Sequence, residues 1–158
     1  MAGTLDASVM RDEGVALRLF GITEAFLDSL ASQELVKSVD MSIAIILRLV
    51  EDYEIHATSN WSERNKAYKK YYSINLDRCA RATELRAARE VRNCLAHGLG
   101  VLTARQRTMS RLALDLSVLD ISVSDGRMIF GPKTVSSFHS ACKEFIVDVD
   151  RRMPILAE

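Results

Sequence analysis

The chain has 158 residues, 48% of them hydrophobic, and its 21 Lys and Arg residues balance 21 Asp and Glu residues. A chain of this size and composition can bury one sizeable core, so we expect a single domain spanning residues 1–158. A net charge of zero excludes a global field that would draw the protein onto nucleic acid or a membrane, so such a partner must bind a local patch.

Two further features bear on where the protein works. The most apolar stretch, residues 43–50, is interrupted by Arg48 and is much too short to cross a bilayer, and the N-terminus has no signal-peptide pattern. Cys79, Cys94 and Cys142 are odd in number and fall within helical patterns, which favours reduced thiols over a disulfide framework. The sequence therefore predicts a soluble, cytoplasmic protein with no membrane contact.

Two long helical patterns occupy the first third of the chain. Apolar residues recur every three or four positions from Ala7 to about Ala31, which predicts a helix with one buried face. A second stripe follows Ser32, with extra apolar residues around Ile45 and Leu47 that predict a central helix buried on more than one side. The first stripe consists of Val15, Leu19, Ile22, Phe26 and Leu30, and the second of Leu35, Val39, Ile43, Ile46, Val50 and Tyr53.

A shorter amphipathic helix is predicted over Glu63–Tyr72, with Ser62 as its cap. It is rich in Lys and Tyr, and such residues can stack on bases and hold phosphates of single-stranded RNA. A connector with one apolar face accounts for the same pattern and is the preferred interpretation. The residues concerned are Tyr68, Lys69, Lys70, Tyr71 and Tyr72.

The next pattern predicts one helix from Leu76 to Gly98, with Asn75 as its N-cap. At 100° per residue, mostly small residues fall on one side and form a predicted core face: Leu76, Ala80, Thr83, Ala87, Val91, Cys94 and Leu95. A polar stripe lies beside that face at the same spacing and consists of Arg86, Arg89 or Glu90, Asn93 and His97. The stripe is the candidate functional surface of the chain.

The remaining elements of secondary structure are predicted from short sequence patterns. Gly98 and Gly100 permit a positive-φ stop, and Thr103 with Gln106 forms a capping-box pattern that opens a helix carrying Arg105, Arg107, Leu112 and Leu116. Asp125-Gly126 predicts a tight turn between strands at 119–123 and 127–130. A last helix follows Pro132, with a stripe of Val135, Phe138, Cys142, Phe145 and Val149. The sequence therefore predicts an all-α fold, a bundle of about four main helices with short extra helices and a small late β-hairpin.

A short motif lies at the end of the fourth pattern, where Arg92-Asn93 is followed three residues later by Ala96-His97-Gly98. This motif resembles that of the HEPN superfamily (higher eukaryotes and prokaryotes nucleotide-binding), whose members carry Arg, a polar residue and then His near the end of an inner helix. The predicted bundle is the scaffold that such a motif normally has. The resemblance is strongest from Leu76 to Thr103 and is architectural elsewhere.

The residue types of the motif suit RNA cleavage without a metal or cofactor. His97 can act as the general acid or base, because histidine has the side chain whose ordinary pKa lies nearest the working pH. Arg92 offers a permanently charged fork for the oxygens of the transition state, and Asn93 can orient the imidazole or bond the substrate. Arg89 and Arg86 are expected to bind the RNA phosphate backbone.

One ideal helix places Arg92 about 140° away from His97, so it cannot bring the two groups to one point. In HEPN ribonucleases, the motifs of two subunits face one another across a dimer axis. The resemblance therefore implies a homodimer with a composite site, and a role as a toxin or antiphage effector with an antitoxin or regulatory protein as a further partner.

Other interpretations of the same residues stay open. Arg92 can be a structural arginine and His97 a cation at a helix C-terminus, in which case the chain is a catalytically silent HEPN-like module that binds a nucleotide, RNA or a protein partner. Cys94 can be a nucleophile, although its apolar position favours an inert thiol. Cys94 and His97, with His139 and Cys142, can also be the halves of a zinc site, but their spacing matches no common zinc motif.

Overall fold

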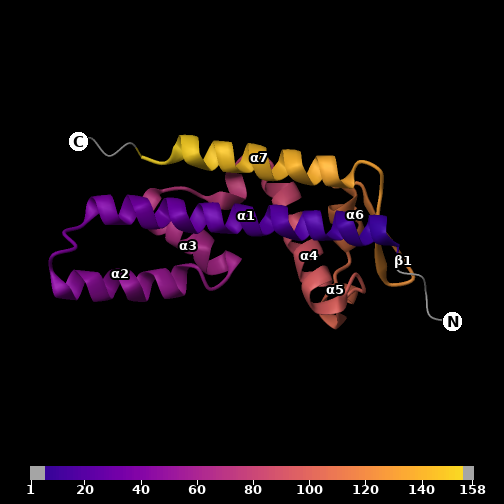
Figure 1. Ribbon diagram of the computed structural model, residues 1–158, viewed down its shortest axis with the longest axis horizontal. Coiled ribbons are helices and arrows are strands. Elements are labelled where there is room, and N and C mark those ends of the chain that lie inside the picture. The colour runs from indigo at the N-terminus through magenta and orange to yellow at the C-terminus, as the bar shows by residue number, and fades with distance from the viewer. Residues whose placement is uncertain (1–5, 155–158) are drawn as a thin grey trace. The chain divides into compact units, whose positions relative to one another are not determined.

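The computed structural model describes residues 6–154 (Figure 1). Within that range the chain folds into helices and one small antiparallel hairpin, so the predicted all-α fold with a late β-hairpin is confirmed. No helix between residues 6 and 154 combines the length and apolar character that a membrane span needs. The elements are α1 (Ala7–Ser38), α2 (Ala44–Ala57), α3 (Trp61–Tyr72), the 3-10 turn η1 (Leu76–Arg78), α4 (Ala82–Gly98), α5 (Ala104–Arg107), α6 (Leu112–Ser117), β1 (Ile121–Ser124), β2 (Arg127–Phe130) and α7 (Thr134–Arg152).

The described residues form two compact units. The first contains residues 6–23 and 81–145, and the second contains residues 24–80 and 146–154. The long helices α1 and α7 each contribute one part to the first unit and the other part to the second. The expectation of a single domain over residues 1–158 stays a prediction.

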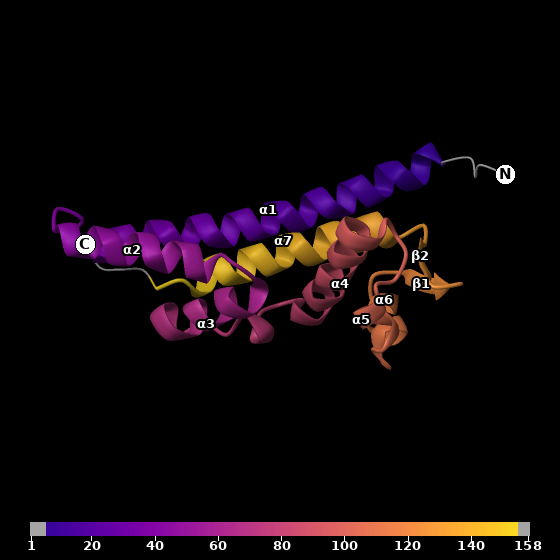
Figure 2. The same ribbon diagram turned by 90° about the horizontal axis from the view of Figure 1, so that it is seen from below.

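The first unit carries the motif helix α4. Figure 2 shows α4, α5, α6 and the hairpin grouped around the first turns of α7, and α4 packs against α6, which in turn packs against β1. The turn of the hairpin has the two positive φ angles that its sequence predicts, 50° at Asp125 and 72° at Gly126. The buried apolar core of this unit includes Ala16, Phe20, Leu85, Val91, Cys94, Leu116, Leu119, Ile121, Phe138, Cys142 and Phe145.

The second unit is held by polar groups as well as by apolar packing. Arg64 of α3 is buried, and its Nε and Nη2 donate to the two carboxylate oxygens of Asp28 on α1 at 2.6 and 2.9 Å. Its Nη1 donates to Glu24 at 3.3 Å. The hydroxyls of Tyr68 and Tyr72 donate to backbone carbonyls of α1 at 2.6 and 2.7 Å. These bonds fix α3 against the second half of α1.

The buried face of α1 differs from the predicted one. Besides Glu34, the buried residues are Ala16, Phe20, Thr23, Leu27 and Ala31, one position out of register with the predicted stripe, and Ile22 is exposed. Thr23 can occupy a buried position because its hydroxyl donates to the carbonyl of Leu19 at 3.0 Å, so no polar group is left unsatisfied. The helix also continues to Ser38, beyond the predicted end.

The prediction of a central helix along the stripe from Leu35 to Tyr53 is wrong. The chain leaves α1 at Ser38, the carboxylate of Asp40 accepts from both the backbone N–H and the hydroxyl of Ser42, and α2 begins only at Ala44. Val50 is the buried residue of α2, whereas Ile45 and Leu49 are 66% and 62% exposed. The apolar composition of this segment therefore does not reflect burial on more than one side.

We predict that the same substitution, leucine to alanine, will have different effects on the free energy of unfolding in α1 and in α2. Leu27→Ala should lower the free energy of unfolding by about 2–5 kcal/mol, because the side chain is fully buried and a cavity is left behind. Leu49→Ala should change it by no more than about 0.5 kcal/mol, because Leu49 already faces solvent. Denaturant unfolding measures both values, and a Leu49→Ala loss as large as that of Leu27→Ala would show that α2 is covered in solution.

Candidate active site

The motif helix is shorter than predicted. Asn75 does act as a cap, but its side chain accepts from the N–H of Asp77 at 3.1 Å in the 3-10 turn η1, not in a long helix. The N–H of Ala80 donates to the carboxylate of Asp148 at 2.7 Å, and Arg81 adopts a φ of 59°, which a continuing helix does not allow. The helix α4 therefore begins at Ala82.

This break changes the predicted core face. Ala80 and Thr83 are exposed, Ala80 before the start of α4 and Thr83 in its first turn. The other members of the face are buried as predicted: Leu76, Ala87, Val91, Cys94 and Leu95.

The motif residues lie in the last turns of α4. Arg92 and Asn93 are partly buried, and the Nη1 of Arg92 donates to the Oδ1 of Asn93 at 3.3 Å. His97 is exposed in the final turn, and its side chain makes no hydrogen bond or ion pair with any residue between 6 and 154. The structure of one chain thus brings Arg92 to Asn93 but brings neither of them to His97.

The chain segment after His97 is held by the hairpin. Leu99 and Gly100 take positive φ angles of 50° and 85°, so the stop falls one residue later than Gly98. The N–H of Leu102 then donates to the carbonyl of Gly126 at 2.8 Å, and the N–H of Met128 donates to the carbonyl of Gly100 at 3.0 Å. These backbone bonds fix the path of the chain directly after the histidine.

The other predicted site residues differ in their surroundings. Arg86 is exposed and Arg89 is partly buried, so both can reach a ligand on the surface of α4. Glu90, which the sequence places in the polar stripe, is only 3% exposed. Its carboxylate accepts from the Nη2 of Arg105 at 2.7 and 2.9 Å and from the Nε2 of Gln106 at 3.1 Å. The stripe is therefore partly covered by α5.

Sequence reasoning missed the roles of Glu90, Arg105 and Gln106. The capping box that opens α5 was predicted and is present, with Thr103 and Gln106 bonded reciprocally. The same Gln106 side chain also donates to the backbone carbonyl of Glu90 at 2.7 Å. A glutamine in a capping-box pattern does not reveal this second bond, because its partner lies 16 residues earlier.

The cysteines lie in the core rather than at the site. Cys94 and Cys142 are buried, while His97 and His139 are exposed, so the Cys and His of each pair lie in different environments. In the described part of the chain, no three His, Cys, Asp or Glu side chains are grouped so that they could hold a metal ion. Burial raises the pKa of the Cys94 thiol, and the carboxylate of Glu13 raises it further. A raised pKa suits an inert thiol, not a nucleophile.

We predict that Cys94 will resist alkylation in the folded protein. At pH 7 to 8 a thiol with a raised pKa is almost entirely protonated, and burial also excludes the reagent. Mass spectrometry of tryptic peptides after iodoacetamide treatment should show labelling of Cys94 only when denaturant is present. Rapid labelling of Cys94 in native protein, at a rate above that of free cysteine, would instead identify it as an activated nucleophile.

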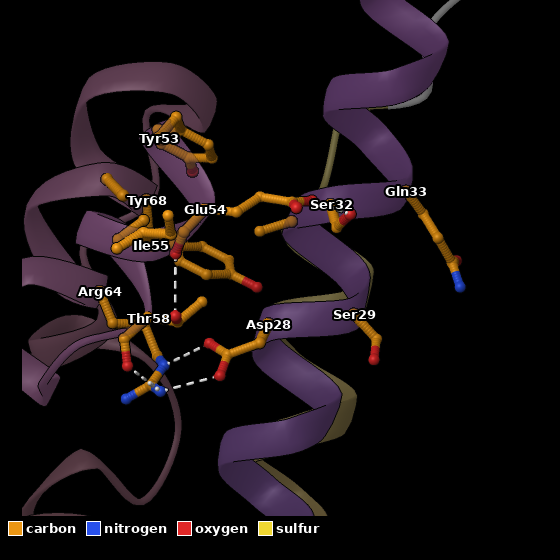
Figure 3. Close-up of a pocket in the computed structure, with 13 residues that line it drawn as sticks. Asp28, Ser29, Ser32, Gln33, Tyr53, Glu54, Ile55, Thr58, Arg64 and Tyr68 are labelled. Atoms are coloured by element: carbon orange, nitrogen blue, oxygen red, sulfur yellow. Dashed lines mark hydrogen bonds and ion pairs between the residues drawn. The ribbon is translucent and has the colours of Figure 1, made fainter. Parts of the chain in front are cut away.

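A pocket of about 550 Å³ lies within the second unit, between α1, α2 and α3 (Figure 3). Among its polar side chains, Arg64 donates to Asp28, and the hydroxyl of Ser32 donates to Glu54. Of the three tyrosines proposed for RNA stacking, Tyr68 and Tyr72 are buried with their hydroxyls bonded to α1, whereas Tyr71 is 47% exposed. The preferred interpretation of this segment, an amphipathic helix with one apolar face, agrees with the structure.

Comparisons of the chain with family models, with curated proteins and with solved structures found no match. The resemblance to HEPN proteins therefore depends on the motif residues Arg92, Asn93 and His97. The all-α fold is compatible with it.

Proposed function

We propose that the protein is a metal-independent endoribonuclease of HEPN type, acting as a toxin or antiphage effector and using no cofactor. The observation that carries this proposal is the state of His97. It is exposed at the end of α4 and is not engaged by any residue between 6 and 154, so its imidazole is available to a substrate. Arg92 and Asn93 lie in the preceding turns, and Arg86 and Arg89 add positive charge to the same helix.

In the proposed reaction, the RNA 2′-hydroxyl attacks the adjacent phosphorus. His97 takes the proton of that hydroxyl or supplies one to the leaving 5′-oxygen, water exchanges the other proton, and the bond from phosphorus to the 5′-oxygen breaks. Negative charge gathers on the non-bridging oxygens, where the guanidinium of Arg92 can hold it. The products are a 2′,3′-cyclic phosphate and a free 5′-hydroxyl, and no metal-bound water takes part.

We further propose that the active site is completed in a homodimer. Arg92 and His97 diverge by about 140° on α4, and no hydrogen bond links them within the chain. A two-fold axis beside the end of α4 would place Arg92 of one protomer near His97 of the other. An antitoxin or regulatory protein that covers this surface would then inhibit the enzyme.

A second function is favoured by one observation. No residue between 6 and 154 hydrogen-bonds to the imidazole of His97, whereas catalytic histidines are commonly oriented by a second group. A module that binds a nucleotide, RNA or a protein without cleaving it would not need that orientation. The two functions differ in whether RNA is cleaved by the wild-type protein.

We predict that His97→Ala will abolish RNA cleavage and leave the fold intact, because His97 is exposed and packing in this part of α4 is provided by buried residues such as Cys94 and Leu95. Arg92→Ala should lower the rate by about a hundredfold to a thousandfold, as expected for the loss of an oxyanion donor. Cleavage of labelled RNA in EDTA, with identification of the 2′,3′-cyclic end, measures both effects.

The matched control is His139→Ala, which removes an exposed histidine from α7 and should leave cleavage unchanged. Undiminished cleavage by the His97→Ala protein would refute the assigned role of the histidine. Failure of the wild-type protein to cleave varied RNAs would favour the binding module.

We also predict a two-fold dimer in solution at micromolar concentration, measured by light scattering coupled to size exclusion. If the site is composite, mixing the His97→Ala protein with the impaired Arg92→Ala protein should raise activity above that of either alone, because a heterodimer contains one intact pairing of Arg92 with His97. A monomer that cleaves RNA, or no recovery on mixing proteins shown to exchange subunits, would refute the composite site.

A further inference from the structure

Glu90 has the most enclosed carboxylate near the motif, and its partners come from α5. The side chain is 4% exposed and accepts two contacts from the Nη2 of Arg105 and one from the Nε2 of Gln106. The Nε of Arg89 lies 3.8 Å from Oε1 of the same carboxylate. One negative charge is thus paired with two guanidinium groups, which leaves the cluster with a net positive charge.

Helix geometry places this cluster on the same side as His97. Residues 86, 90, 93 and 97 are spaced by four, three and four positions, so they form one stripe that spans about 60° around the axis. Glu90 and His97 differ by only about 20° and lie two turns apart. Arg105, which is bound to Glu90, therefore lies along the stripe that ends in His97, whereas Arg92 points away from it.

Arg105 has unused hydrogen-bonding capacity. Its side chain is 63% exposed, and only Nη2 is engaged, by Glu90. Neither Nε nor Nη1 makes a hydrogen bond with the described residues, so the N–H groups of both nitrogens remain available to a ligand. A guanidinium that is held through Nη2 and has free N–H groups can donate charge-assisted hydrogen bonds to phosphate oxygens.

We propose that Arg105 is a further phosphate-binding residue for RNA, on the His97 side of α4, and that Glu90 is the positioning residue that holds it there. This inference rests on the proposed function, because the ligand it names is the RNA substrate. The phosphate bound by Arg105 would belong to a nucleotide flanking the cleaved bond, since His97 lies two turns further along the helix. Arg105 lies outside the Arg-polar-x3-His motif and extends the site onto α5.

Four single variants and one double variant test the proposal by fluorescence anisotropy with a labelled single-stranded RNA and by cleavage of the same RNA. Arg105→Ala should raise the Kd about tenfold, the loss expected for one charge-assisted hydrogen bond, and should lower the slope of log Kd against log salt by about 0.7. Arg105→Lys keeps a positive charge beside Glu90, so the fold is retained, but it loses the planar fork and should weaken binding by an intermediate factor.

Arg107→Ala is the matched control. It removes the same charge from the same short helix, but the Nη1 of Arg107 donates to the carbonyl of Leu102 and not to Glu90. The affinity of Arg107→Ala should stay within about twofold of the wild-type value. Circular dichroism at the assay temperature verifies that each variant is folded.

The Glu90→Gln variant tests whether Glu90 positions Arg105 or only lowers the local positive potential. If Glu90 only lowers the local positive potential, its neutralisation should tighten RNA binding. If it holds Arg105 in place, the same change should weaken binding toward the Arg105→Ala value, and the double variant should be no weaker than Arg105→Ala alone. Tighter binding by folded Glu90→Gln would refute the positioning role.

The outcomes distinguish this inference from the proposed function. RNA cleavage by the wild type together with equal affinities for Arg105→Ala and Arg107→Ala would overturn the inference and leave the ribonuclease proposal standing. RNA binding without cleavage, combined with a loss specific to Arg105→Ala, would overturn the ribonuclease and support the phosphate contact. Neither binding nor cleavage by the wild type would overturn both.

Discussion

The buried carboxylate of Glu90 is the constraint that organises the region around the motif. A carboxylate can leave water only where hydrogen-bond donors replace its hydration shell. Here the donors come from Arg105 and Gln106 on α5, so that short helix must lie against α4. The chain between Gly98 and Thr103 has to cover the intervening distance in a few residues, which requires a sharp reversal directly after His97. The exposed position of His97 at the end of α4 is thus linked to the burial of Glu90 two turns earlier.

Elements with local signals were predictable from the sequence. Asp125-Gly126 identified the hairpin turn because few residues tolerate two consecutive positive φ angles. The Thr103-Gln106 pair identified the start of α5 because both bonds of a capping box join residues three apart. The stripe of α7 was also placed correctly, since Phe138, Cys142 and Phe145 are all buried. In each case the determining interaction lies within a few residues.

The predictions that were wrong concern features set by burial or by contacts between residues far apart in the sequence. The break before α4 depends on Asp148, which accepts from the N–H of Ala80 and is 68 residues away in the sequence. The stripe of α1 was misplaced by one position because Thr23 is buried with its hydroxyl bonded inside the helix, which a count of apolar residues does not reveal. The isoleucines and leucines of α2 were assigned to a core that does not surround them. At the candidate site, the arginine and histidine of the motif were identified from the sequence, but Glu90 was assigned to a polar surface because its partners lie on another helix.

The bonds between the hairpin and the segment after α4 have one further consequence. They join backbone groups of Gly100 and Leu102 to those of Met128 and Gly126. The side chains of Leu102 and Met128 take no part in these bonds, whereas Gly100 and Gly126 have positive φ angles of 85° and 72° that favour glycine. The same bonds make the two segments open and close as one cooperative unit. A molecule that binds the hairpin would consequently alter the mobility of the helix end that bears His97 without contacting the histidine itself. The two-stranded sheet would in that case act as an allosteric site.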